Sequence, residues 1–285
     1  MTSVIVCFYN RLNHLRCCLD SLKLCSGDFD EVVIADDGTD RGVVSRLKNM
    51  LKNYDFPIKH VWQPKKSFRV ARARNNGIRN SRGDFLIFLD CDYAILPDTL
   101  KRHLEARKPK RFSAAHFKYL NREQTRKVFE SKITEELLKN LYRNLPERKI
   151  LRTHYRYLKH SLLARLHLYP ARKQNLCGHF SIFRKDIEYV NGFDENFVGW
   201  GGEDKDLGIR LVKAGIYCKP LIRQARALHL WHSPELGNKK WEEGTNIKYF
   251  YRKNIPYYCE NGLNKHNPTQ FKRSSEFIIA TGEVD

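Results

Sequence analysis

The chain has 285 residues, of which 41% are hydrophobic and 29% are charged. This composition is typical of a soluble globular protein and excludes a disordered or fibrous chain. The apolar runs, such as Val4–Phe8 and Phe85–Leu89, are too short to span a bilayer. Met1 leads almost directly into the first apolar run, without a basic segment or a small-residue cleavage site, so we expect no secretory signal.

Positive charge is concentrated in the middle of the chain. The formal net charge is +20, and the stretch from Lys101 to Asn175 holds 21 Lys/Arg against 6 Asp/Glu, a surplus of 15. Such a surplus indicates a polyanionic partner, which can be nucleic acid, an anionic membrane surface or a phosphorylated substrate. The alternative is a solvated helical face that only keeps the protein in solution. Both interpretations stay open at this point.

The eight cysteines are scattered, and they form neither a CxxC pair nor a Cys/His block with zinc-binding spacing. Several lie inside apolar runs, where a reduced cysteine packs as a small hydrophobic residue. We therefore expect reduced thiols and a cytoplasmic location.

The first part of the chain alternates β-rich and helical segments. The expected strands are Ser3–Phe8, Glu31–Ala35, Ile58–Trp62 and Phe85–Leu89, and the expected helices are Leu12–Leu24 and Val70–Ser81. This alternation predicts a mostly parallel sheet, in which ligands bind outside the carboxyl ends of the strands. Polar clusters follow three of the strands at that end, namely Asn10/Arg11, Asp36/Asp37 and Asp90/Asp92.

The rest of the chain is less regular. Leu100–Leu168 is rich in Lys, Arg, Leu and Glu, and we expect it to be largely helical. Cys177–Phe183 has strand character, and Glu203–Ala214 is an amphipathic helix that ends at Gly215. Roughly the last twenty residues are expected to be a loosely packed tail.

Asp90-Cys91-Asp92 directly follows an apolar strand. Two carboxylates at positions i and i+2, on a chain leaving a strand, can face one hard divalent cation that also binds phosphates. Mg²⁺ and Mn²⁺ favour such oxygen-rich ligation. Acidic pairs also cap helices or face water, so the position after a buried strand is what favours the metal site.

At this point the sequence resembles glycosyltransferase family 2 with the GT-A fold. The resemblance rests on Asp36-Asp37-Gly38-Thr39, Phe68-Arg69, Arg74-Asn75-Asn76-Gly77 and the strand ending in Asp90-Cys91-Asp92. It implies an α/β fold with a Rossmann-like, mostly parallel central sheet flanked by helices, with a helical basic insertion. It also implies a UDP-sugar donor held by Phe8, Asn10, Arg11, Asp36, Asp37, Phe68, Arg69, Asn75, Asp90 and Asp92. By this likeness an acidic residue of the second-strand motif contacts uracil, Asp90 meets the ribose or metal, and Asp92 is the direct metal ligand.

A second motif runs from Gly199 to Leu207 and contains Trp200 between glycines, followed by Glu203 and Asp204. Glycines let a loop approach a substrate closely, and a tryptophan offers a flat apolar face for a sugar ring. An ordinary acidic helix N-terminus would explain the two carboxylates but not the tryptophan between glycines.

This stretch resembles the acceptor-side motif of β-1,4-galactosyltransferases and bacterial chondroitin-type polymerases. The likeness implies that Asp204 is the general base, that Glu203 binds an acceptor hydroxyl and that Trp200 stacks on a sugar. Gly201 and Gly202 belong to the same acceptor-binding loop. A carboxylate suits the task, because the acceptor oxygen must lose a proton as it attacks the anomeric carbon.

His229-Leu230-Trp231-His232-Ser233 is the third element. In the resembled families a histidine about this far beyond the Glu-Asp motif completes the metal shell, and His232 matches best. His229 stands where some relatives carry another ligand. The chain has 11 histidines, and a single histidine is more often a packed or surface residue. Cys177-Gly178-His179 departs from the family pattern near the donor sugar, so the sugar specificity does not carry over.

The resemblance divides the chain into one GT-A domain, residues 1–258, and a C-terminal tail, residues 259–285. Within the domain, residues 1–98 form the nucleotide-binding half, residues 99–176 the basic helical segment, and residues 177–258 the acceptor-binding and catalytic half. The resemblance covers neither the basic segment nor the tail.

The resulting expectation is inverting transfer of a hexose or N-acetylhexosamine from a UDP-sugar to a glycan hydroxyl, with Mn²⁺ or Mg²⁺. The acceptor would be lipopolysaccharide, capsule or another cell-surface polysaccharide, free or lipid-linked. The basic segment would then dock a cytoplasmic protein peripherally on the anionic inner face of the membrane.

Two alternatives remain. A basic nucleic-acid-binding module would explain the charge and the aromatic residues among basic ones in Arg152–Tyr157, but it leaves Asp90, Asp92 and the Trp200 loop unexplained. A nucleotidyltransferase would also use a metal, but the chain has no Walker loop. We therefore expect no specific nucleic-acid partner.

Overall fold

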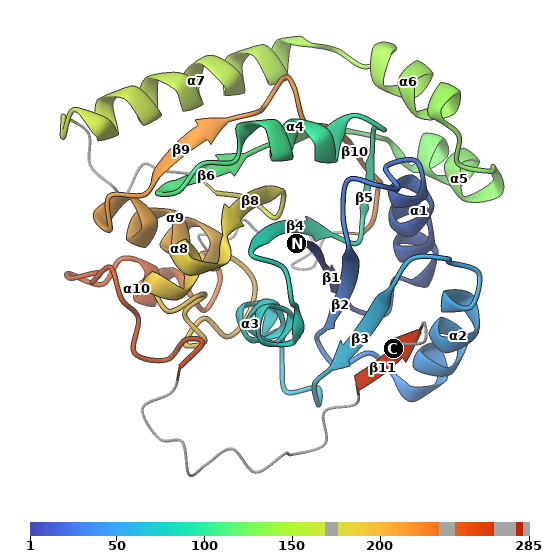
Figure 1. Cartoon of the computed structure of the whole chain (residues 1–285), viewed down its shortest axis with the longest axis horizontal. Coiled ribbons are helices and arrows are strands. Elements are labelled where there is room, and N and C mark those ends of the chain that lie inside the picture. The colour runs from blue at the N-terminus through green and yellow to red at the C-terminus, as the bar shows by residue number, and fades with distance from the viewer. Residues whose placement is uncertain (169–175, 234–242, 265–277, 282–285) are drawn as a thin grey trace.

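The computed structural model describes residues 1–168, 176–233, 243–264 and 278–281. Within these ranges two β-sheets are covered by helices, as Figure 1 shows. The helices are α1 Leu12–Lys23, α2 Arg41–Leu51, α3 Val70–Asn80, α4 Thr99–Ala106, α5 Arg122–Glu130, α6 Glu135–Arg143, α7 Arg148–Arg165, α8 Arg184–Tyr189, α9 Glu203–Lys213 and α10 Ile247–Phe250.

The larger sheet has eight strands in the order β11-β3-β2-β1-β4-β8-β6-β9. Their bounds are β11 Ile278–Thr281, β3 Ile58–Trp62, β2 Glu31–Asp36, β1 Thr2–Phe8, β4 Phe85–Asp90, β8 Phe180–Phe183, β6 Arg111–Ala114 and β9 Tyr217–Pro220. The strands β3, β2, β1 and β4 are mutually parallel, while β11 and β8 run antiparallel to their neighbours. The expected mostly parallel α/β sheet is confirmed.

The register of this sheet brings the predicted polar clusters to one edge. Phe8 pairs with Asp36, and Cys7 pairs with Asp90, so the carboxyl ends of β1, β2 and β4 lie level. A smaller sheet joins β5 Tyr93–Ile95, β10 Arg226–His229 and β7 His116–Tyr119. Because β5 directly follows the Asp90–Asp92 turn, this second sheet extends the same edge.

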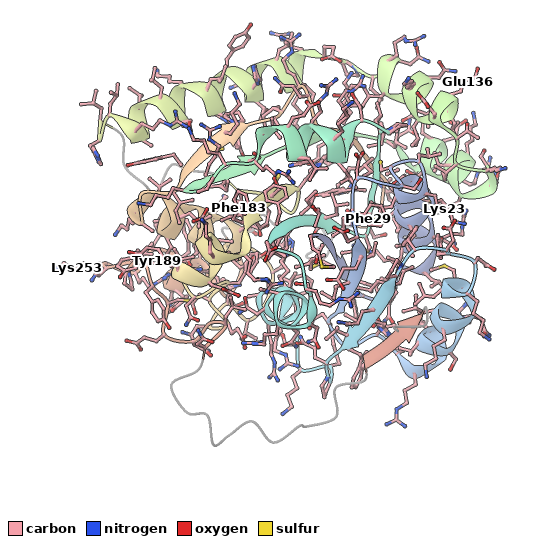
Figure 2. The ribbon with its side chains drawn as sticks, in the orientation of Figure 1. Lys23, Phe29, Glu136, Phe183, Tyr189 and Lys253 are labelled. Carbon is pink, nitrogen blue, oxygen red and sulfur yellow. The ribbon has the colours of Figure 1, made fainter. Side chains whose placement is uncertain are left out.

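The continuous apolar runs form strands because both faces of the larger sheet are buried. Alternate residues of a strand point to opposite faces. Accordingly, Ile5 and Val33 belong to one hydrophobic core, with α3, α8 and α9, whereas Val4 and Val6 belong to the other, with α1, α2 and α4. Figure 2 shows the side chains filling the space between the sheet and these helices. The edge of the sheet that carries the polar clusters is therefore held from both sides.

The basic segment is largely helical, as predicted, because α4, α5, α6 and α7 take up most of Leu100–Leu168. Two short strands, β6 and β7, lie between α4 and α5 and were not predicted. Strand β6 pairs with both β8 and β9, and such pairing outweighs a weak local helix propensity. The prediction for the tail is corrected in one place, because β11 pairs with β3 rather than lying loose. Residues 265–277 and 282–285 lie outside the described residues.

All eight cysteines are free thiols, and seven of them are buried. Across the described ranges, no helix combines the length and the apolar character that a membrane crossing requires.

Candidate active site

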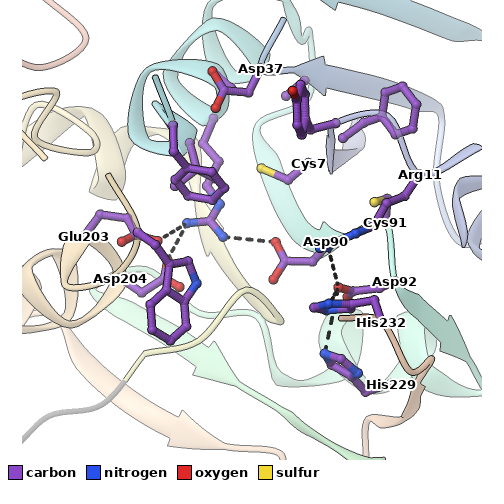
Figure 3. A pocket seen from close by; sticks show the side chains of 18 residues that line it. Cys7, Arg11, Asp37, Asp90, Cys91, Asp92, Glu203, Asp204, His229 and His232 are labelled. Atoms are coloured by element: carbon purple, nitrogen blue, oxygen red, sulfur yellow. Dashed lines mark hydrogen bonds and ion pairs between the residues drawn. The ribbon is translucent and has the colours of Figure 1, made fainter. Parts of the chain in front are cut away.

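A pocket of about 250 Å³ lies at the carboxyl edge of the larger sheet (Figure 3). Its walls come from the ends of β1, β2 and β4, the start of α3, the loop before α9, and the end of β10. The predicted site residues that line it are Phe8, Arg11, Asp37, Phe68, Asp90, Asp92, Trp200, Glu203, Asp204, His229 and His232. The fold thus brings the Asp90–Asp92 turn, the Trp200 loop and the two histidines into one cavity.

Asp92, His229 and His232 form a compact group whose potential ligand atoms all lie within 4.8 Å of one another. Oδ2 of Asp92 is 3.0 Å from Nε2 of His232 and 3.8 Å from Nε2 of His229. The smaller sheet brings these residues together, because Asp92 immediately precedes β5, and His229, at the end of β10, pairs with Tyr93 of β5. We call Asp92, His229 and His232 the metal cluster.

The metal cluster fits a divalent cation. Oδ1 of Asp92 is buried and has no hydrogen-bond partner within the described residues, as expected of an oxygen that binds a cation. Burial opposes ionisation of Asp92, but the hydrogen bond with His232 and the charges of His229 and Arg11 hold its pKa below the usual carboxyl value. Two imidazoles beside one carboxylate favour a transition-metal ion such as Mn²⁺ over Mg²⁺, which prefers oxygen ligands.

The opposite wall of the pocket is organised by Arg74, which lies on α3. Its Nη1 donates to Oδ1 of Asp204 at 2.6 Å and to Oε1 of Glu203 at 3.3 Å, and its Nη2 donates to Oδ1 of Asp90 at 3.0 Å (Figure 3). The Arg74 side chain is only 4% exposed. We call Arg74, Asp90, Glu203 and Asp204 the arginine cluster.

This arrangement changes the expected role of Asp90. Its Oδ1 accepts from Arg74, and its Oδ2 accepts from the hydroxyl of Tyr93 at 3.2 Å. Asp90 is not part of the compact metal cluster. The two carboxylates of the Asp90–Asp92 turn therefore face different partners, and of these two the geometry favours only Asp92 as a metal ligand, beside His229 and His232.

Asp204 has the electrostatics of a general base near neutral pH. Burial, helped by the charges of Glu203 and Asp90, raises its pKa to about 7, although the charge of Arg74 acts to lower it. Burial also raises the pKa of Glu203. Within the described residues, Oδ2 of Asp204 has no hydrogen-bond partner, and Oε2 of Glu203 is buried without one. Both carboxylates therefore keep one oxygen for a substrate.

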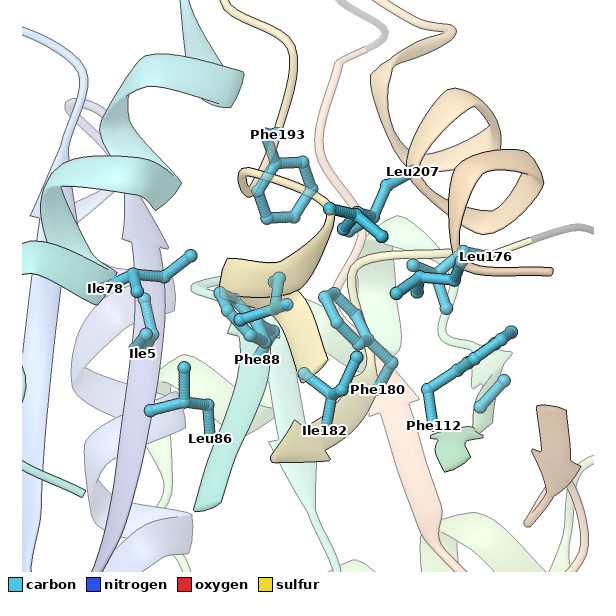
Figure 4. Close-up of a cluster of buried hydrophobic side chains, with 14 of the residues drawn as sticks. Ile5, Ile78, Leu86, Phe88, Phe112, Leu176, Phe180, Ile182, Phe193 and Leu207 are labelled. Carbon is cyan, nitrogen blue, oxygen red and sulfur yellow. The ribbon is translucent and has the colours of Figure 1, made fainter. Parts of the chain in front are cut away.

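The core beneath the pocket fixes the position of Arg74. Its guanidinium lies 5.2 Å from the centre of the Phe193 ring. Phe193 in turn meets Phe88 and Phe180, whose rings are stacked with centres 4.4 Å apart (Figure 4). Leu207 of α9 belongs to the same core. Helix α3, which carries Arg74, and helix α9, which carries Glu203 and Asp204, are thus packed against one set of aromatic side chains.

The loop around Trp200 needs its glycines. Gly199, Gly201 and Gly202 have φ of +100°, +91° and +96°, a left-handed conformation that other residues rarely adopt. Gly199 N–H donates to the carbonyl of Phe68, and Asn246 Nδ2 donates to the carbonyls of Gly199 and Gly201. Trp200 remains 38% exposed and lines the pocket. The loop is therefore held by its backbone while the indole stays accessible.

Of the two aspartates at the end of β2, only Asp37 lines the pocket. Its oxygens accept from Gln63 Nε2 and from the backbone N–H of Arg69, each at 2.7 Å. Asp36 is fully buried instead, 2.7 Å from His60 Nε2, and it accepts from the N–H of Thr39. The prediction that Asp36 contacts the nucleotide is therefore corrected to a structural role.

Asn10, Arg69 and Asn75 also lie outside the pocket lining. The amide of Asn10 exchanges two hydrogen bonds with Asp40, each 3.0 Å long. The amide of Asn75 is fully buried and bonds both the N–H and the carbonyl of Phe193. The side chain of Arg69 donates to the carbonyl of Pro64. The buried amide of Asn75 holds the backbone of Phe193, so its predicted contact with the nucleotide is corrected. The contacts predicted for Asn10 and Arg69 stay predictions.

Three residues that shape the site were not among the predicted site residues: Arg74, Gly178 and Asn246. Arg74 stood in the recognised Arg74–Gly77 motif, but helix periodicity alone did not show that it faces three carboxylates. A Cβ at Gly178 would lie 2.0 Å from Oδ2 of Asp90, so only glycine fits there. Asn246 stands alone in a polar stretch, and no sequence signal marks it.

Comparison with known proteins identifies the family. Residues 3–189 match the family model of glycosyl transferase family 2, so the chain belongs to that family. Residues 160–233, which include the Trp200 loop and both histidines of the metal cluster, match the model described as the N-terminal domain of galactosyltransferase. The protein is a glycosyltransferase.

Curated relatives agree with this assignment. The uncharacterized glycosyltransferase YfnE of Bacillus subtilis is 28% identical, over 92% of this chain and 70% of its own length. Chondroitin synthase of Escherichia coli is 26% identical over 88% of this chain, and validoxylamine A glucosyltransferase of Streptomyces hygroscopicus is 31% identical over 76%. The chain spans only 39% and 52% of these last two proteins.

Solved structures share the GT-A fold. The mannosyltransferase PcManGT of Pyrobaculum calidifontis, in complex with GDP-Man and Mn²⁺, aligns over 83% of this chain and 58% of its own, with a TM-score of 0.55 and 16% identity. A fragment of S. aureus TarS in complex with UDP-GlcNAc aligns over 82% and 59%, with the same TM-score and identity.

Proposed function

We propose that this glycosyltransferase moves a hexose or N-acetylhexosamine from a UDP-sugar to a hydroxyl of a glycan, with inversion and with Mn²⁺. One observation carries the proposal: the metal cluster and the carboxylates Glu203 and Asp204 line the same pocket. The complexes of TarS with UDP-GlcNAc and of PcManGT with GDP-Man and Mn²⁺ support a nucleotide-sugar donor and a metal.

The donor would occupy the side of the pocket lined by Phe8, Asp37 and Phe68. Asp92, His229 and His232 would hold the cation, which when bound stabilises negative charge on the departing diphosphate. Arg11 lies 3.7 Å from Oδ2 of Asp92 and lines the same wall, so it can add a positive charge for a phosphate oxygen.

The acceptor would enter between Trp200 and Asp204. The indole face offers a surface for a sugar ring, and the unpartnered oxygen of Glu203 can accept a hydrogen bond from a second hydroxyl. Asp204 would take the proton of the attacking hydroxyl. The acceptor oxygen bonds to the anomeric carbon while the bond from that carbon to the diphosphate breaks, so a single displacement inverts the configuration.

The support for the acceptor class comes from the relatives rather than from the geometry of the pocket. Relatives include chondroitin synthase and validoxylamine A glucosyltransferase, which points to a glycan or another polyhydroxylated acceptor. We propose a cell-surface glycan such as lipopolysaccharide or capsule, built on the cytoplasmic face of a membrane. The nucleic-acid-binding alternative accounts for the net charge but gives no use to either cluster in the pocket.

The experiment that tests this function measures UDP release from a panel of UDP-hexoses and UDP-N-acetylhexosamines, with Mn²⁺ and a set of glycan acceptors. We expect acceptor-stimulated release from at least one donor, abolished by EDTA and restored by Mn²⁺. The variant Asp204→Asn serves as the control for contaminating activity. No release from any UDP-sugar, together with binding of UDP that is indifferent to Mn²⁺, would contradict the proposal.

A further inference from the structure

Helix α7 buries one face against the protein and exposes another. The buried face consists of Ile150, Thr153, Tyr157, Ser161 and Ala164, spaced three or four residues apart. The helix packs on β9, where the hydroxyl of Ser161 donates to the carbonyl of Cys218 at 2.5 Å. In Figure 1, α7 runs along the outside of the molecule, above β9 and β6. One face of this helix is therefore fixed, and the opposite face points away from the sheet.

The outward face carries a stripe of large apolar side chains. Tyr155, Leu158, Leu162 and Leu166 have exposed fractions of 63%, 42%, 60% and 55%. Their spacing of three or four residues places them side by side on the helix surface. Contiguous exposed apolar side chains of this kind mark interaction sites, whereas single ones carry no such meaning.

The same helix is strongly cationic. From Arg148 to Arg165 it holds six Lys/Arg and no Asp/Glu. The six are Arg148, Lys149, Arg152, Arg156, Lys159 and Arg165, all exposed, and none forms an ion pair within the described part of the chain. The surplus of positive charge that the sequence places between Lys101 and Asn175 thus includes a set of cations gathered around one apolar stripe.

We propose that the exposed face of α7 docks the protein on an anionic membrane surface. An apolar stripe flanked by Lys and Arg is the combination that lies in the interface of an anionic bilayer, with the leucines among acyl chains and the cations at the headgroups. A second copy of the chain fits less well, because pairing two such faces would bring twelve unpaired cations together, six from each α7. A neutral apolar partner would give the cations no role.

The position of α7 links this surface to the active site. Lys149, in the first turn of α7, lies with Nζ 4.2 Å from the centre of the Tyr119 ring. The Tyr119 ring centre is 5.0 Å from that of His229, a member of the metal cluster. A protein docked through α7 would therefore hold its pocket close to the membrane, where a lipid-linked acceptor lies. This last link rests on the proposed function, whereas the docking itself does not.

A second pocket extends the positive surface beyond the start of α7. It has a volume of about 520 Å³, and Arg143 and Arg223 line it. Neither arginine pairs with a carboxylate among the described residues. The docking surface therefore has further cations beside it that can meet lipid phosphates.

Vesicle co-sedimentation of the full chain tests the proposal. The vesicles are phosphatidylcholine alone or phosphatidylcholine mixed with phosphatidylglycerol, at low and at high salt. We expect binding to the anionic vesicles only, falling as salt rises. The double variant Leu158→Ser/Leu162→Ser should bind them about tenfold more weakly or worse, because two exposed leucines that would insert among the acyl chains are lost. Arg152→Gln/Lys159→Gln should weaken binding by a similar factor.

Matched controls separate docking from overall charge and hydrophobicity. Arg46→Gln/Lys48→Gln removes two exposed cations from α2, which lies on the far side of the molecule from α7 in Figure 1. Tyr189→Ser removes an aromatic residue of 56% exposure at the end of α8 (Figure 2). Both controls should bind vesicles like the unaltered protein. All variants should keep the thermal midpoint and the UDP-sugar turnover in solution, so loss of docking is distinguishable from loss of the proposed reaction.

Four results would overturn the proposal. Equal binding to neutral and anionic vesicles would exclude electrostatic docking, and equal losses in the α2 and α7 charge variants would make the effect one of net charge. If the α7 charge variant instead weakened binding to RNA and not to vesicles, the partner would be a nucleic acid. If the protein dimerised through Leu158 and Leu162 without binding lipid, the face would be a contact between copies.

Discussion

The metal cluster and the arginine cluster both place negative charge in the pocket, but they differ in the cation that balances it. In the metal cluster, Asp92 lies beside two imidazoles, and its buried Oδ1 has no hydrogen-bond partner within the described residues. Its negative charge is therefore suited to binding a metal cation from solution. In the arginine cluster, three carboxylates share the internal cation Arg74. The comparison shows how one residue type takes two roles in one cavity, because its surroundings differ.

The pKa values follow this division. The pKa of Asp92 is held below its usual range, which suits a permanent ligand, whereas burial raises the pKa of Asp204 to about 7. A carboxylate that titrates near neutral pH can accept a proton in the transition state and release it afterwards. Asp90, two residues before Asp92 in the same turn, belongs to the arginine cluster.

The largest expected effect is on Asp204. Replacing it by Asn keeps the shape but removes the base, so transfer should fall by about 10²–10⁴-fold at saturating acceptor. Steady-state turnover measured by UDP release checks this. Asp186→Asn alters a carboxylate with a raised pKa outside the pocket and is the matched control. Near-normal turnover of Asp204→Asn would show that another group is the base.

The next effect separates the two histidines of the metal cluster. His232→Ala should weaken Mn²⁺ binding on the order of tenfold or more, and His229→Ala by less, because His232 is nearer to Asp92 Oδ2. Isothermal titration calorimetry with Mn²⁺ measures the affinity of both variants. His167→Ala, an exposed histidine outside the pocket, should leave the affinity unchanged. Equal affinities for all three variants would remove the histidines from the site.

The smallest effect is a displacement of the pH profile. In the proposed reaction Asp204 must be ionised to accept the proton, so we expect kcat/KM to rise with pH through about 7. Arg74 lowers the pKa of Asp204, and weakening that contact must raise the pKa and move the rising limb to higher pH. Arg74→Met should move it further than Arg74→Lys, which keeps the charge. Arg79→Lys, on the same helix but paired with Glu195, should leave the profile in place. A shift to lower pH in the Arg74 variants would contradict the assignment.

Much of the candidate site's lining could be predicted from sequence because strand ends and loops carry it. Asp92, Trp200 and Asp204 stand in motifs that follow or precede recognisable elements. The choice between Asp36 and Asp37 could not be predicted, because consecutive side chains of an extended chain point to opposite sides. Which side reaches the pocket depends on how β2 packs against its neighbours.

The role of Arg74 and the position of strand β6 were also missed, because both depend on contacts between segments far apart in the chain. Arg74 bridges three carboxylates only because α3 packs against Phe193, which stands far away in the chain. Strand β6, inside the segment expected to be helical, is four residues long and exists through its pairing with β8 and β9. Short strands of this kind lack a periodic signal, so tertiary contacts decide their structure.

The most direct test of two clusters with separate roles is a titration of UDP, with and without Mn²⁺, into Asp92→Asn and Asp204→Asn. We expect Asp92→Asn to lose the Mn²⁺-dependent part of UDP binding, and Asp204→Asn to bind UDP and Mn²⁺ like the unaltered protein. Loss of Mn²⁺-dependent binding in both variants, or in neither, would contradict the division of the pocket.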